Sequence, residues 1–143
     1  MVAYSFKKRF ISPIQLGLQM KVDPKHRLVP VADLLPKTQT IRAEGKRRHA
    51  RKGETLQLYQ SQRTKQCFLI GTAPCRSVES IELLLKNNSI DVKIEGFKLK
   101  SKQIDEFVRE DGFKDVADML DFWKTEHPGV TDFRGFLIKW MPK

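Results

Sequence analysis

Apolar and polar residues alternate with a period of two through much of the first hundred positions of the 143-residue chain. This period is typical of β-strands, because successive side chains of a strand point to opposite faces of the sheet. The pattern predicts strands at residues 2–6, 38–42, 54–60, 65–73, 77–85 and 91–99. Residues 65–73 are almost continuously apolar, as in a strand buried on both faces, and Gly71 and Pro74 mark where that strand would bend. These segments predict a strand-rich barrel core.

Other segments repeat their apolar residues at helical spacing. Residues 11–18 predict a short helix with Pro13 in its first turn, where proline is tolerated. From residue 101 onward the period is 3.6 and predicts two helices. Their apolar positions are Ile104, Phe107 and Val108 in the first, and Val116, Met119, Leu120 and Trp123 in the second. Residues 133–141 return to the strand pattern and are expected to close the barrel. The order of elements predicts one α+β domain over residues 1–143.

Residues 20–36 follow neither period. They contain three prolines and charges of both signs, which favours an ordered excursion of the chain over a linker between domains. The sequence VADLL at residues 31–35 predicts a single helical turn within it.

The charge of the chain indicates the kind of molecule that it binds. The chain holds 27 basic and 17 acidic residues, a net charge of +10, with a pI near 9.8. Residues 105–126 contain eight acids and three bases, a local balance of −5, so the rest of the chain carries +15. Because such a surplus attracts phosphate-rich molecules over long range, the composition favours RNA as a partner.

Several classes of protein are not indicated by the sequence. No apolar run approaches the roughly twenty residues of a membrane span, and the N-terminal residues lack the apolar core of a signal sequence. We therefore expect a cytoplasmic protein that does not bind membranes, and we expect it to be a monomer. Cys67 and Cys75 have neither the number nor the spacing of a disulfide framework or zinc site, and we expect both to be buried. The histidines are scattered, so no metal and no cofactor are predicted.

The sequence KTQTIR, residues 37–42, carries the first candidate chemistry. On a strand Thr38, Thr40 and Arg42 share one polar face, and Lys37 stands at the entry to that strand. A threonine hydroxyl becomes a useful nucleophile when a neighbouring base takes its proton, and a lysine acts as that base when its pKa is lowered. The alternative is a pair of strand threonines beside a surface lysine, and spacing alone does not separate the two.

A basic run follows directly. It consists of Arg42, Lys46, Arg47, Arg48, Arg51 and Lys52. Six cations with Glu44 as the one acid among them suit contacts to phosphates, each of which contributes about −0.7 to the log–log salt slope on single strands. The alternative is a solvated loop whose charges serve solubility.

Acidic and aromatic residues supply the remaining candidates. Glu110 and Asp111 precede Gly112, where a carboxylate either joins a site or caps the following helix. Candidates for stacking on a base, each of which can equally belong to the core, are Phe6, Phe10, Tyr59 and Phe113.

Five sequences along the chain together resemble the ASCH domain, a branch of the PUA-like β-barrels. They are SFKKRF, KTQTIR, KGETLQLY, CFLIGTA and EDGFKDVADMLDFW, and the resemblance that they carry extends over most of the chain in the same order. The resemblance implies a small bent β-barrel with flanking helices and a cleft that takes RNA or a modified nucleoside.

KTQTIR is also similar to the KTxTIR segment of the small bacterial N4-acetylcytidine amidohydrolases. This likeness implies that Lys37 activates, that Thr40 is the nucleophile and that Arg42 anchors the pocket or its backbone. The carboxylate of that family falls on Glu110 or, in the register used here, on the shorter Asp111. In that family the lysine closely follows a glycine that ends the first helix, whereas Gly17 and Lys37 are twenty positions apart here. The likeness therefore implies an insertion at residues 19–36, which either widens the basic surface or occludes the pocket.

Three functions remain open at this point. An amidohydrolase needs Lys37, Thr40 and a carboxylate within hydrogen-bond reach of one another. A non-catalytic RNA-binding module needs only the cleft and the basic run, and a ribonuclease would use the same surface with lysine and glutamate in place of paired histidines. The net charge of +10 favours polymeric RNA over a free nucleoside as the molecule that is bound.

Overall fold

The computed structural model describes residues 2–142, which form a mixed seven-stranded sheet with three α-helices, an α+β fold. The strands are β1 (Val2–Phe6), β2 (Gln39–Ala43), β3 (Thr55–Gln60), β4 (Phe68–Leu85), β5 (Ile90–Ile94), β6 (Phe97–Lys98) and β7 (Asp132–Trp140). The α-helices are α1 (Ile11–Gly17), α2 (Ser101–Glu110) and α3 (Val116–Glu126), and the 3-10 turns are η1 (Lys8–Phe10), η2 (Pro24–His26) and η3 (Val31–Asp33). The predicted helices and the helical turn in VADLL are confirmed.

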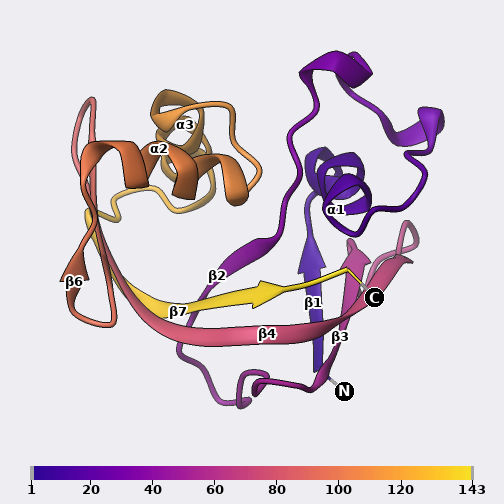
Figure 1. Ribbon diagram of the computed structural model, residues 1–143, viewed down its shortest axis with the longest axis horizontal. Coiled ribbons are helices and arrows are strands. Elements are labelled where there is room, and N and C mark those ends of the chain that lie inside the picture. Colours follow the sequence, from indigo (N-terminus) through magenta and orange to yellow (C-terminus); the bar gives the residue numbers. More distant parts are fainter. Residues whose placement is uncertain (1, 143) are drawn as a thin grey trace.

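Strand β4 is the longest strand and organises the sheet. Its first part pairs with β3, its second part pairs with both β5 and β7, and the two apolar runs predicted separately are therefore one strand of 18 residues. Irregularities in register occur where β4 meets β3 and again between Cys75 and Ser77. Such irregularities bend a strand, and β4 follows a long curve beneath the helices (Figure 1).

The barrel closure expected of residues 133–141 is absent. Strand β7 uses one edge for β4 and the other for β2, while β1 pairs in parallel with β3. No pairing joins β1 to β2 between residues 2 and 142, so the sheet stays open along these two strands. Sequence periodicity identified the strands, but closure depends on which distant edges meet.

The helices lie inside the curve of the sheet. Helices α2 and α3 cover one end of β4, and α1 covers the other end (Figure 1). The core between these layers is continuous and mostly aliphatic and aromatic. Its most deeply buried large side chains include Ile11, Ile14, Leu56, Leu58, Ile81, Phe113, Met119, Leu137, Ile138 and Trp140. None of the helices described is long and apolar enough to cross a membrane.

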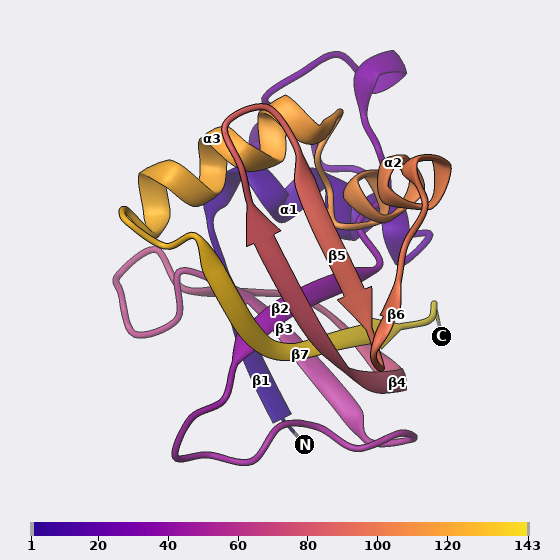
Figure 2. The same cartoon turned by 90° about the vertical axis from the view of Figure 1, so that its left-hand side faces the viewer.

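Residues 19–36, called the strap below, form a long loop, and Gly17 before it and Lys37 after it lie close together. A Cβ atom on Gly17 would collide with the carbonyl oxygen of Lys37, and the Lys37 backbone N–H donates to the Pro13 carbonyl at 2.9 Å. The strap stands beside α1 at the top of the molecule in both views (Figures 1 and 2). The chain thus places Lys37 directly against the end of α1, although Gly17 and Lys37 are twenty positions apart.

Candidate functional site

A cavity of about 490 Å³ lies between β1, β2 and the α2–α3 region. Its wall contains four of the polar residues singled out from the sequence, Lys37, Thr40, Arg42 and Asp111. They come from two parts of the chain more than sixty positions apart, because the turn after α2 packs against the start of β2. One hydrogen bond that holds this contact runs from the Thr38 N–H to the Glu110 carbonyl at 2.9 Å.

Lys37 is almost completely buried, with 2% of its surface exposed. Its Nζ donates to the Asp111 carbonyl oxygen at 2.6 Å, lies 3.7 Å from Asp111 Oδ1 and stands 4.6 Å from the centre of the Phe10 ring. Burial lowers the pKa of Lys37 from 10.5 to about 8, while the Asp111 carboxylate opposes this change and Arg42 adds to it. The amine is therefore partly neutral near neutral pH, as a general base requires.

Asp111, and not Glu110, provides the carboxylate of this cavity. Asp111 is buried next to Lys37, and burial raises its pKa while the lysine acts in the opposite direction. The Glu110 side chain is exposed and lines a separate cavity with Thr38 and Arg109. Of the two carboxylates considered from the sequence, Asp111 therefore lines the cavity of Lys37 and Glu110 does not.

Thr40 and Arg42 lie side by side in the wall. Arg42 Nε donates to Thr40 Oγ1 at 3.1 Å, and a terminal nitrogen of Arg42 donates to the Ser5 carbonyl at 2.7 Å. No hydrogen bond between residues 2 and 142 joins Lys37 Nζ to Thr40 Oγ1. Thr38 lies outside this cavity, contrary to the shared face predicted from alternation, because β2 begins only at Gln39.

Aromatic rings form much of the remaining wall. Three of the four stacking candidates line the cavity, namely Phe6, Phe10 and Phe113, whereas Tyr59 does not. Phe122, Trp123 and Phe133 also line it, although the helical period placed Trp123 only on the apolar face of a helix and no pattern singled out Phe122 or Phe133. Rings of this kind suit a flat heteroaromatic base.

Gln39 is a buried polar residue that the sequence did not single out. Its Nε2 donates to the Phe107 carbonyl at 3.3 Å and to Asp111 Oδ1 at 3.4 Å. Its Oε1 is buried without a hydrogen-bond partner among the described residues. Gln39 thus connects β2 to the Asp111 carboxylate, and no sequence pattern indicated this contact.

The basic run divides into two parts. Arg42 belongs to the cavity, while Lys46, Arg47, Arg48, Arg51 and Lys52 lie on the exposed loop between β2 and β3. This loop lies at the end of the molecule opposite the helices (Figures 1 and 2). Arg48 makes two hydrogen bonds of 2.7 Å to Glu54, which lower the pKa of Glu54 to about 2.

His49 attaches this loop to the sheet. Its Nε2 lies 2.8 Å from the Ala43 carbonyl, and its Nδ1 lies 3.0 Å from the Tyr4 hydroxyl. The Ala50 N–H also donates to that hydroxyl, at 3.2 Å. Since a carbonyl only accepts, the neutral ring carries its proton on Nε2 and accepts from Tyr4.

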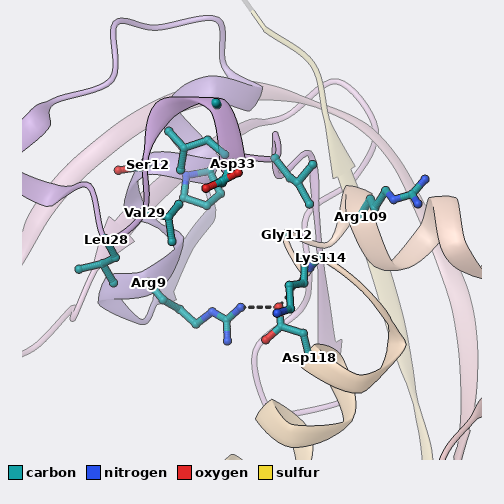
Figure 3. Close-up of a pocket in the computed structure, with 13 residues that line it drawn as sticks. Arg9, Ser12, Leu28, Val29, Asp33, Arg109, Gly112, Lys114 and Asp118 are labelled. Carbon is teal, nitrogen blue, oxygen red and sulfur yellow. Dashed lines mark hydrogen bonds and ion pairs between the residues drawn. The ribbon is translucent and has the colours of Figure 1, made fainter.

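The strap lines a second cavity, of about 830 Å³ (Figure 3). Leu28, Val29 and Asp33 of the strap face Lys114 and Asp118 across it, and Arg9 is paired with Asp118 at 2.9 Å. No strap residue lines the cavity of Lys37. The strap therefore does not occlude that cavity.

The two cysteines differ in exposure, and the potential metal ligands of residues 2–142 are dispersed. No cluster of three or more potential metal ligands occurs among residues 2–142. Cys75 is buried as expected, but Cys67 is exposed because it lies in the turn before β4. Both are free thiols.

Comparison of the chain with protein-family models, curated proteins and solved structures finds no match.

Proposed function

We propose that the protein is a PUA-like protein of the ASCH type that binds RNA or a modified nucleoside and hydrolyses the N4-acyl amide of N4-acetylcytidine. The observation that carries this proposal is the shared cavity of Lys37, Thr40, Arg42 and Asp111 with its aromatic walls. A nucleophile, a base of lowered pKa and a carboxylate are the groups that amide hydrolysis through an acyl-enzyme requires.

In the first half of the reaction, neutral Lys37 takes the proton of the Thr40 hydroxyl through one bridging water molecule, since the two groups are not hydrogen-bonded directly, as Thr40 Oγ1 attacks the acyl carbonyl carbon. A neutral amine has one lone pair and two N–H bonds, so Lys37 can accept this proton while still donating to the Asp111 carbonyl. Arg42 Nε, already 3.1 Å from Thr40 Oγ1, stabilises negative charge on that oxygen. The Asp111 carboxylate favours the lysine cation that results.

In the second half, the tetrahedral intermediate collapses and the bond from the acyl carbon to N4 breaks. The electron pair stays with N4, which receives the proton held by Lys37 and leaves as the amine of cytidine. Water then attacks the Thr40 ester, its proton passes through Lys37 back to Thr40 Oγ1, and the carboxylic acid departs. One water molecule is consumed, and the side chains regain their starting states.

RNA binding stands as the companion proposal, and the exposed loop after β2 supports it. Lys46, Arg47, Arg51 and Lys52 are exposed there and form no ion pair with any described residue. Exposed, unpaired cations are the groups that neutralise phosphates. A ribonuclease would use the same surface, but no further observation favours that reaction.

The test is release of cytidine from N4-acetylcytidine and from an RNA that contains it, followed by chromatography. We expect turnover by the wild type, loss of turnover in Thr40→Ala, and retention in Thr38→Ala, a matched threonine outside the cavity. Lys37→Ala should abolish turnover as fully as the double variant with alanine at both Lys37 and Thr40, because Lys37 and Thr40 act as one unit. Absence of turnover on both substrates would refute hydrolysis and leave a binding module.

A further inference from the structure

Lys7 lies where the cavity of Lys37 opens to solvent. It directly follows β1, its side chain is 64% exposed, and it lines the cavity together with Glu126 at the end of α3. Lys7 Nζ and Glu126 Oε2 form an ion pair of 3.6 Å. The other exposed lining residues are Ala43 and His127, so this pair supplies the fixed charges of the rim.

The three basic residues of the sequence KKR have different surroundings. Arg9 lines the strap cavity and is paired with Asp118 (Figure 3). Its guanidinium carbon also lies 4.9 Å from the centre of the Phe113 ring. Lys8 lines neither that cavity nor the cavity of Lys37. Lys7 is therefore the residue of this group that can contact a molecule entering the cavity of Lys37.

The partner of Lys7 is easily replaced. Ion pairs between exposed side chains contribute little, because water and salt screen them and two flexible chains must be held in place. Glu126 offers one negative charge, whereas a phosphate monoester carries up to two and has more acceptor oxygens. A phosphate brought to the rim competes well for the lysine.

We propose that Lys7 binds a phosphate group of the substrate and that Glu126 holds this lysine while the cavity is empty. The site then selects phosphorylated N4-acetylcytidine, either as a nucleotide or within RNA, over the free nucleoside. This inference rests on the proposed function, since it requires the acylated base to occupy the cavity.

The experiment compares three ligands by calorimetry, with Thr40→Ala as the background that prevents turnover. They are N4-acetylcytidine, its 5′-monophosphate, and a trinucleotide with N4-acetylcytidine in the middle. At low salt we expect the two phosphate-bearing ligands to bind about fivefold more tightly than the nucleoside, the effect of one close charge pair in water. This ratio should decrease as salt is added.

The variants separate the inference from the proposed function. Lys7→Ala should bring the ratio close to one, Glu126→Gln should increase it, and Lys8→Ala, a matched neighbour, should leave it unchanged. A preference for the monophosphate identifies a terminal phosphate as the ligand, and a preference for the trinucleotide identifies an internal one. Equal binding of all three ligands, or a ratio that survives Lys7→Ala, overturns this inference alone. Failure of every ligand to bind overturns the proposed function as well.

Discussion

Replacing Lys37 with methionine removes a buried amine and keeps a side chain of similar length. Folding moves this amine out of water to a position beside Phe10 and Asp111, and its pKa decreases from 10.5 to about 8. Between these values the unfolded chain still holds the proton that the folded chain has released. The free energy of unfolding therefore increases with pH across this window in the wild type. Lys37→Met lacks the group and should not show this increase.

The size of the effect follows from the two pKa values. Their difference, at about 1.4 kcal/mol for each tenfold change in proton affinity, gives about 3 kcal/mol over the whole window. About 2 kcal/mol of this should develop between pH 7.5 and 9.5, a range in which urea titrations are practical.

The assay is urea denaturation followed by the fluorescence of the buried Trp123 and Trp140. Wild type and Lys37→Met are compared at pH 7.5 and pH 9.5, so that titrations shared by both proteins cancel. Stability of the wild type should increase relative to the variant by about 2 kcal/mol. If the free energies of unfolding of the two proteins differ by the same amount at both pH values, Lys37 keeps an ordinary pKa. That result would exclude Lys37 as a general base.

Three further predictions concern the frame of the site, its carboxylate and the basic loop. Gly17→Ala places a methyl group against the Lys37 carbonyl oxygen and should cost about 1–3 kcal/mol in thermal unfolding, whereas Gly45→Ala, with open space around it, should cost far less. Asp111→Asn removes a charge that raises the pKa of Lys37, so the alkaline rise of kcat/KM should move to lower pH, while exposed Glu110→Gln should not move it. Alanine at Lys46, Arg47 and Arg51 should flatten the log–log salt slope of RNA binding by about 0.7 for each phosphate that is no longer neutralised. The same change of charge at exposed Lys93, Lys98 and Lys102 serves as its control, and equal slopes for the two triple variants would exclude the loop from the interface.

The elements of the fold were largely predictable from periodicity, because each pattern is local. Residues 101–126 show the 3.6 period of α2 and α3, and the structure has both helices. Barrel closure was wrongly predicted, since it depends on whether the distant edges of β1 and β2 meet. Thr38 was wrongly placed as well, because the alternation of a strand does not extend to a residue that precedes β2.

The candidate site could be predicted only in part. Lys37, Thr40 and Arg42 belong to one short sequence, so their proximity was expected. Asp111 reaches them through the packing of the turn after α2, and the residues alone left open whether a carboxylate of that turn joins a site or caps the following helix. Gln39 had no signal at all, since a glutamine within a strand ordinarily faces water. Its burial follows from contacts with Phe107 and Asp111, which lie far along the chain.

The contact between Gly17 and Lys37 has a consequence for how this chain can change. The strap is an eighteen-residue loop whose two ends already touch, so its closure costs entropy that grows only with the logarithm of its length. Doubling or halving the loop would change the free energy of folding by about 0.6 kcal/mol. Insertions, deletions or a fluorescent tag near Pro24 or Pro30 are therefore compatible with an unchanged position of Lys37. The cavity lined by the strap can therefore change in shape while the cavity of Lys37 stays the same.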